Sequence, residues 1–278
     1  MRLPRFAREP AVRAFGRIFG VDFSEVRDPL GSFPSIQDFF VRRLKPGVRP
    51  EDSDPTTFVS PCDGAWGAWG EVEAGTLLQV KGRPYSLAEL LGDPPENGTG
   101  GGLAGRFEGG TYLTLYLSPR DYHRFHTPCR GSIFRTRYLP GGLWPVNRAG
   151  LTGVDGLFAR NERICAFARV EGVGGSGAGT LAMVAVGATL VGKVKLQFDD
   201  LETNLPGAAA AERSYDPPVE LERAEEWGRF EFGSTLVLIA TPGLVMLEGG
   251  APGAPVRLGL RLGVLGSRRR EECAGEEA

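Results

Sequence analysis

Glycine and proline interrupt this chain too often for long helices to dominate its fold. The sequence holds 41 glycines and 21 prolines among 278 residues, and both residue types mark turns or end regular elements. Short apolar segments lie between them, and several have the composition and alternation of β-strands. In one of these segments Leu113, Leu115 and Leu117 share a face, as every second residue of a strand does. The segments predicted as strands are 111–117, 131–139, 163–170, 180–196, 234–240 and 256–265.

The order of these segments predicts the fold class. The strands do not alternate with long helices, so a parallel α/β sheet is not expected. We predict an α+β fold that is mostly β. N-terminal amphipathic helices precede a β-rich catalytic domain with a sandwich or barrel-like core.

Charge and cysteine usage exclude several classes of protein. The formal net charge is −2, which gives no indication of nucleic-acid binding. The cysteines Cys62, Cys129, Cys165 and Cys273 are scattered, without metal-ligand spacing, and are expected to be reduced thiols of a cytoplasmic protein. No apolar run suits a signal peptide, and none reaches the roughly 18 residues of a transmembrane helix.

The N-terminal region carries two predicted helices. Residues 8–20 have apolar side chains at helical spacing and arginines largely off that face. Such a helix can lie on an anionic membrane or cover its own domain, and periodicity alone favours the second. A second helix is expected to start at Ser35, which forms a capping-box pattern with Asp38, and to end before Pro46.

A proline-rich, acidic stretch at residues 49–55 marks a predicted boundary. It divides the chain into an N-terminal helical region, 1–50, and a β-rich domain, 51–278.

The chain has two histidines, His123 and His126, so proton transfer by imidazole near neutral pH depends on them. Ser118, Pro119 and Asp121 precede them in the pattern of a helix start. We therefore expect a short helical turn that brings both imidazoles to one pocket at a strand end. The alternatives are two surface histidines beside a turn, or a metal site that lacks an evident third ligand.

A nucleophile and a third partner are also present. Among five Gly-Ser pairs, Gly233-Ser234 stands at the entrance of a strongly apolar strand, where glycine leaves the preceding carbonyl open to approach. Asp63, in the segment SPCDG, is either a turn residue or the orienter of a histidine, as in Ser-His-Asp catalysis. An intact Ser-His-Asp hydrolase would need a strand-to-helix nucleophile elbow, and a non-catalytic β-rich binding module stays possible.

The chain resembles the phosphatidylserine decarboxylase family at these residues and over most of its length. The matching segments keep the family's order. They are FPSIQDFFVRRLKPGVRP (33–50), SPCDG (60–64), YLSPRDYHRFHTP (116–128), LPGGLWPVN (139–147), LFARNERICAF (157–167), VAVGATLVGKV (184–194) and EFGSTLVLI (231–239). Phe232 replaces the family's usual leucine, and Trp144 stands where phenylalanine is common. Neither departure removes a chemical group.

The resemblance implies that the chain is a self-processing proenzyme. Ser234 attacks the Gly233 carbonyl, His126 takes the serine proton and Asp63 balances the charge. Elimination and hydrolysis then leave a pyruvoyl group at residue 234, the covalent cofactor. The products are a β chain, 1–233, and an α chain, 234–278.

The resemblance also implies the reaction and its partners. The pyruvoyl carbonyl forms a Schiff base with phosphatidylserine, which is converted to phosphatidylethanolamine and carbon dioxide. His123 is the candidate for handling the proton at the α-carbon, while Lys193 and Lys195 are ordinary strand lysines. Because this substrate lies in a bilayer, residues 1–50 are expected to dock peripherally on the cytoplasmic face of the cell membrane. A homodimer is a family expectation, and a pyruvoyl enzyme for a soluble amino acid is the nearest alternative.

Overall fold

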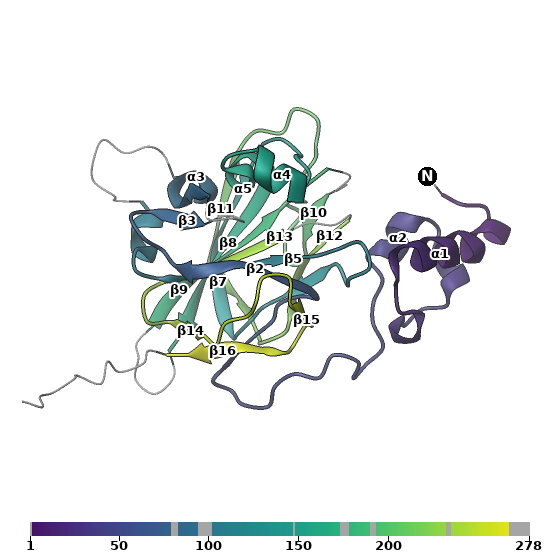
Figure 1. Ribbon diagram of the computed structural model, residues 1–278, viewed down its shortest axis with the longest axis horizontal. Coiled ribbons are helices and arrows are strands. Elements are labelled where there is room, and N and C mark those ends of the chain that lie inside the picture. Colours follow the sequence, from purple (N-terminus) through teal and green to yellow (C-terminus); the bar gives the residue numbers. More distant parts are fainter. Residues whose placement is uncertain are drawn as a thin grey trace, which may run out of the picture.

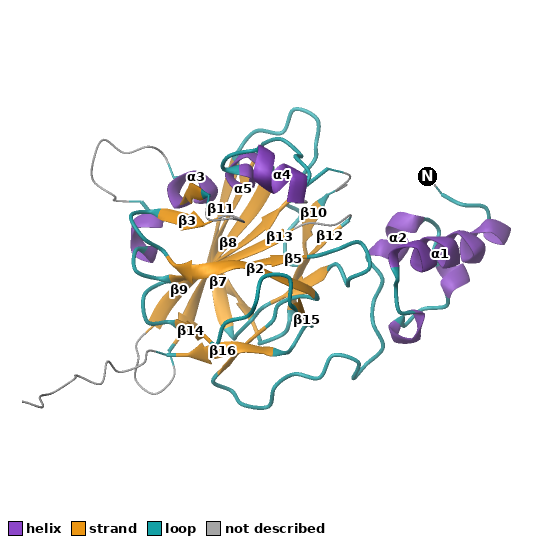
Figure 2. Ribbon diagram, in the orientation of Figure 1, coloured by secondary structure: helices purple, strands orange, loops and turns teal. Residues whose placement is uncertain are grey.

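The structure is a computed structural model that describes residues 2–78, 83–93, 102–146, 148–172, 178–189, 193–231 and 235–266. The protein is mostly β, with 39% strand and 18% helix. A large sheet lies at the centre, and the N-terminal helices stand apart from it on one side (Figure 1). Short helices cover the sheet above, and smaller sheets lie against it (Figure 2). The prediction of an α+β, mostly β fold is confirmed.

The central sheet has eight strands and is antiparallel throughout. Their spatial order is β11 (Ala211–Leu221), β7 (Gly131–Leu139), β8 (Arg163–Glu171), β9 (Ala178–Val186), β13 (Thr235–Ala240), β5 (Thr111–Tyr116), β2 (Gly64–Glu71) and β15 (Pro255–Val256). Within the described residues β11 and β15 form open edges, so the sheet does not close on itself. The layered alternative of the prediction is therefore correct, and the barrel-like alternative is wrong.

The middle strands are buried on both faces. Along β13, Leu236 and Leu238 belong to one hydrophobic core, while Val237 and Ile239 belong to a second core across the sheet. All six residues of β13 are buried. Two-sided burial explains why this segment reads as a continuous apolar run rather than as an alternating one.

Different elements cover the two faces. The first core includes side chains from two three-stranded sheets: β10 (Val194–Leu196), β12 (Glu226–Phe230) and β6 (Arg124–His126) in one, and β1 (Thr57–Val59), β16 (Arg261–Leu265) and β14 (Val245–Leu247) in the other. The second core includes side chains of β3 (Thr76–Leu78), β4 (Pro84–Ser86), α3 (Leu87–Leu91), η4 (Ala104–Phe107) and α5 (Leu157–Arg160). Figure 1 shows α4 (Arg148–Gly153) beside α5. Such layers bury apolar surface on each side of one sheet, as a sandwich does.

The N-terminal region has a small core of its own. It contains α1 (Arg5–Phe19), η1 (Phe23–Glu25), η2 (Leu30–Ser32) and α2 (Ile36–Phe40). Val12 and Phe39 are fully buried in this core. A Cβ at Gly16 would lie 2.2 Å from the Phe23 ring, so the close packing of α1 on η1 requires glycine there. No helix in the described residues is both long and apolar enough to cross a bilayer.

Most predicted elements are present with shifted ends. Strand 131–139 is found as predicted, and strand 256–265 divides into β15 and β16. Ser35 caps α2 by accepting from the Asp38 backbone at 3.1 Å, but the helix ends at Phe40, well before Pro46. The chain leaves the helix early because the backbone after it pairs elsewhere: the Arg27 N–H donates to the Arg43 carbonyl.

The two-sided core predicts unequal effects of two apolar truncations. Ile239→Ala, at a fully buried position, should lower the free energy of unfolding by about 2–5 kcal/mol, because it loses transfer energy and leaves a cavity. Leu260→Ala, at a 48% exposed position, should change it by less than about 0.5 kcal/mol. Urea unfolding followed by circular dichroism measures both, and equal losses would contradict the assignment of the core.

Candidate functional site

The loop between β5 and β6 (residues 117–123, the histidine loop) carries His123, leads into His126 at the end of β6, and is closed by a tight turn. The Ser118 backbone N–H and its hydroxyl each donate to the Asp121 carboxylate at 2.7 Å, and the Asp121 N–H donates to the Ser118 carbonyl at 2.9 Å. The expected helical turn is absent. The Asp121 side chain folds back on Ser118 and closes a single turn, after which the chain extends into β6 and carries His126 on a strand.

His123 is fully buried and has one defined tautomer. Its Nδ1 lies 2.8 Å from the Asp121 carbonyl, which can only accept, so Nδ1 carries the hydrogen and Nε2 the lone pair. The Phe40 ring packs on the imidazole with 3.9 Å between centroids. Within the described residues Nε2 is buried without a hydrogen-bond partner. Burial lowers the pKa of His123 to about 3, the Asp121 carbonyl acts against this, and the charge of Arg42 adds to it.

Arg42 was not among the residues predicted from sequence, yet it holds the histidine loop. Its Nη2 donates to the carbonyls of Arg120 at 2.7 Å and Asp121 at 3.1 Å. The Asp121 carbonyl thus meets both Arg42 and the Nδ1 of His123. Desolvation lowers the pKa of Arg42 to about 10, so it stays charged at neutral pH. Its position in the segment FFVRRLKPG, just after Phe40, is the sequence signal that could have identified it.

His126 lies at the end of β6 and also has a fixed tautomer. Its Nδ1 donates to the Ala224 carbonyl at 2.7 Å, and its Nε2 lies 3.4 Å from the Tyr122 hydroxyl. Burial is the main cause that lowers its pKa, while the charges of Glu226 and Asp63 act to raise it. Nε2 is therefore the nitrogen that can act as a base.

The segment that contains Asp63 is hydrogen-bonded to the backbone of His126, but the Asp63 carboxylate has other partners. The His126 N–H donates to the Pro61 carbonyl at 2.8 Å. The Asp63 carboxylate accepts from Arg49 Nε at 2.8 Å and Nη2 at 2.6 Å, and from the Leu258 N–H at 2.9 Å. Asp63 therefore acts on His126 through charge, without a hydrogen bond to it.

Arg49 joins Asp63 to the N-terminal region. Its Nη2 also donates to Glu25 at 2.7 Å. Burial opposes the charge of Arg49, but the hydrogen bonds to Asp63 and Glu25 outweigh it and raise its pKa. A buried forked pair of this kind fixes position as well as charge. Arg49 was not among the site residues predicted from the sequence.

Residues 232–234, which include the predicted Gly233-Ser234 pair and Phe232, lie outside the described residues. The chain before them contacts the histidine loop, and the chain after them pairs with the end of β5 that leads into this loop. Before them, the Phe230 N–H donates to the His123 carbonyl at 2.9 Å. After them, Thr235 pairs with Tyr116 at the end of β5, two residues before Ser118. The Thr235 hydroxyl is buried without a hydrogen-bond partner in the described part of the chain.

The other residues considered from the sequence, Lys193, Lys195 and Trp144, show no catalytic arrangement among the described residues. Lys193 and Lys195 form ion pairs with Glu202 at 2.5 and 3.0 Å. Trp144 is 50% exposed. Residue 235 enters a strand directly, which does not match the strand-to-helix elbow of a conventional serine hydrolase.

Comparisons with known proteins agree on one class, the decarboxylating lyases. A family model described as phosphatidylserine decarboxylase matches residues 36–264. The phosphatidylserine decarboxylase proenzyme of Anaeromyxobacter sp. (strain K) is 45% identical over 94% of this chain and 89% of its own. The proenzymes of Brevibacillus brevis and Myxococcus xanthus are 39% and 38% identical, over 82% and 95% of this chain and 78% and 89% of theirs. The chain belongs to the phosphatidylserine decarboxylase family.

Protonation of the two histidines can be measured directly, because the chain contains no others. With a pKa of about 3, His123 should stay neutral in the Nδ1–H form down to about pH 4 in NMR spectra of ¹⁵N-histidine-labelled protein. Arg42→Leu should raise the pKa of His123, since the Arg42 charge lowers it. Arg43→Leu, at an exposed neighbour, is the matched control and should leave it unchanged. Titration of wild-type His123 near pH 6.5 would contradict its burial.

The lowered pKa of His123 also makes the stability of the fold depend on pH. The folded pKa of His123 lies below its ordinary value of 6.5, so the unfolded chain binds the proton first as pH falls. The free energy of unfolding should therefore decrease from about pH 6.5 toward pH 3.

Proposed function

We propose that this chain is a phosphatidylserine decarboxylase that cleaves itself between Gly233 and Ser234. One observation carries the proposal: before that bond the Phe230 N–H donates to the carbonyl of buried His123, and after it Thr235 pairs with Tyr116, where β5 leads into the histidine loop. Family membership supplies the reaction class. The substrate, the cleavage and the cofactor named below are parts of the proposal.

Processing begins with the serine hydroxyl. His126 Nε2 takes the proton from Ser234 Oγ, which attacks the Gly233 carbonyl. The bond from that carbonyl to the Ser234 nitrogen then breaks, the nitrogen takes up the proton, and the amide has become an ester. Loss of the Ser234 α-proton then expels the ester as the Gly233 carboxylate. The dehydroalanine left at residue 234 takes up water, releases ammonia and becomes the pyruvoyl group.

The contacts of His126 suit it to this role. The Ala224 carbonyl holds Nδ1–H, which leaves Nε2 as the basic nitrogen. Protonation of a buried imidazole is costly, and the carboxylates of Glu226 and Asp63 offset part of that cost. Asp63 is itself held by Arg49, so its charge is fixed in place.

Two buried polar atoms fit a pyruvoyl group at residue 234. The Nε2 of His123 and the Oγ1 of Thr235 lack hydrogen-bond partners in the described residues, and a buried polar atom normally has one. The group would supply a ketone carbonyl that condenses with the substrate amine and takes up the electron pair left on the α-carbon when carbon dioxide leaves. The neutral, oriented Nε2 of His123 is suited to hold the proton delivered to the substrate α-carbon.

The N-terminal surface suits a substrate that lies in a bilayer. Phe6, Ile18 and Phe19 lie on one helix, α1, and are 85%, 76% and 43% exposed; arginines flank them. Apolar side chains beside basic ones are typical of helices that lie in an anionic interface. We propose that residues 1–50 dock on the cytoplasmic face of the cell membrane.

Processing has a direct test by intact mass. Wild type should appear as two chains, with residues 234–278 lacking a free amino terminus. Ser234→Ala and His126→Ala should stay uncut because each removes a group needed for the acyl shift. Ser132→Ala, in another Gly-Ser pair, is the matched control and should be cut normally. A single full-length wild-type chain would refute the proposal.

His123 separates cleavage from decarboxylation. His123→Ala should still be cut at least in part, while the decarboxylation rate of the cut enzyme should fall about 10²–10⁴-fold with loss of a positioned acid or base. Release of carbon dioxide from labelled phosphatidylserine measures this rate. An unchanged rate would remove His123 from the reaction.

Membrane docking is tested by vesicle flotation. Replacement of Phe6 and Ile18 by serine should weaken binding to phosphatidylserine-containing vesicles, because each exposed apolar side chain buried in the interface contributes roughly 1.5–3 kcal/mol. Leu205→Ser, at a 43% exposed leucine outside the N-terminal region, is the control. Unchanged flotation after deletion of residues 1–20 would eliminate this surface.

A further inference from the structure

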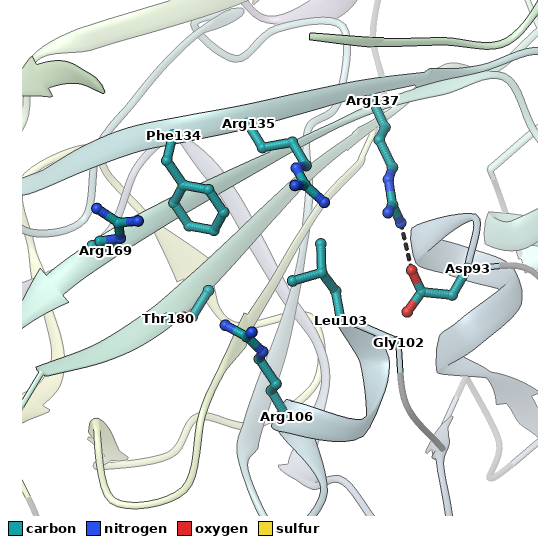
Figure 3. Close-up of a pocket in the computed structure, with 9 residues that line it drawn as sticks. All are labelled: Asp93, Gly102, Leu103, Arg106, Phe134, Arg135, Arg137, Arg169 and Thr180. Carbon is teal, nitrogen blue, oxygen red and sulfur yellow. Dashed lines mark hydrogen bonds and ion pairs between the residues drawn. The ribbon is translucent and has the colours of Figure 1, made fainter. Parts of the chain in front are cut away.

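A cluster of arginines lies on the helix-covered side of the central sheet, away from the histidine loop. It surrounds a cavity of about 460 Å³ whose lining includes Asp93, Arg106, Phe134, Arg135, Arg137 and Arg169. Figure 3 shows Arg106 and Arg135 extending into it from opposite walls. Thr180, which also lines the cavity, lies at the end of β9 near Ala240. Thr235, which follows the proposed cleavage site, pairs at the other end of β9.

The charges of this cavity are not balanced within the described residues. Arg137 is bound to Asp93 and to Glu212, each at 2.5 Å, and Arg135 lies 3.5 Å from the same Glu212. Neither Arg106 nor Arg169 forms an ion pair with a described carboxylate. Two positive charges therefore remain around the cavity after both carboxylates are counted, in a chain whose net charge is −2.

The arginines are held in positions that suit an anion. Arg169 packs over the Phe134 ring at 5.2 Å, and Arg137 packs over Phe167 at 5.6 Å, which limits the freedom of both guanidinium groups. A register shift between Ile133 and Arg135 lets consecutive residues of β7 line the same cavity. Among the described residues the buried Arg135 Nε makes the 3.5 Å ion pair with Glu212 but no hydrogen bond.

We propose that this cavity binds a soluble anion that carries at least two phosphate charges. Guanidinium groups match phosphate oxygens in charge and in forked geometry, and the cavity volume lies within the range of small-molecule sites. The site does not suit a headgroup of the bilayer on which we propose that the N-terminal region docks. Figure 1 places α3, which is followed by Asp93, on the side of the β domain opposite α1 and α2.

Pyrophosphate is the probe, and isothermal titration calorimetry on the full chain is the measurement. Wild type should bind pyrophosphate, and inorganic phosphate more weakly because it carries less charge. Arg106→Ser and Arg169→Ser should each weaken pyrophosphate binding at least about tenfold, as expected for loss of one charge-assisted contact. Both positions are exposed, so folding is expected to survive either change.

Arg160→Ser is the matched control, because Arg160 is an exposed arginine outside the cavity. It should bind pyrophosphate as wild type does. No binding to wild type, or equal loss in the control, would overturn the proposal. Vesicles of phosphatidylglycerol form the second arm: binding that depends on Arg106 and Arg169 there, without pyrophosphate binding, would assign the site to a lipid headgroup instead. None of these readouts depends on cleavage or decarboxylation.

Discussion

Burial of the central strand β13 on both faces is the constraint on which the rest of the site depends. Its side chains contribute to two cores at once, and it pairs with β5 and β9 along its full length. Such a strand cannot slip by one residue, because every side chain would then change core. Thr235 therefore has a fixed position, and so does the point at which the preceding chain reaches it. The loop after β5 begins beside that same point.

Buried polar contacts extend this fixed frame to the N-terminal region. Arg49 connects Glu25 with Asp63, and Arg42 holds the backbone beside His123. Gln37 of α2 also donates to Glu231 at 2.8 Å, next to the proposed cleavage segment. Loss of one partner of a buried charged pair costs more than the pair contributes, because the other charge stays desolvated. The region proposed to contact the membrane is thus also part of the environment of the histidines.

Local pattern predicted the strands well and the polar partners poorly. Strand 131–139 was correct because its turns and alternation are encoded by neighbouring residues. The prediction of a helical turn at Ser118 was wrong. The pattern Ser-Pro-x-Asp suits a helix start and a closed turn equally, and the contacts of Asp121 with Ser118 produce the closed turn. Arg42 and Arg49 were missed because their partners lie far away in sequence, as with Arg42 and the carbonyl of Arg120. The pairing of Ser234 with His126 and Asp63 stays a prediction.

The sequence by itself determined the mostly β fold, the set of residue types available for catalysis and, through a series of ordered motifs, the family. These properties depend on periodicity and on residue identity, both of which can be read along the chain. Only the tertiary structure decided which tautomer each histidine has, that Asp63 is bound by Arg49, and that several arginines surround one cavity. Hydrogen-bond partners and desolvation depend on groups brought together across the fold, and no local pattern encodes them.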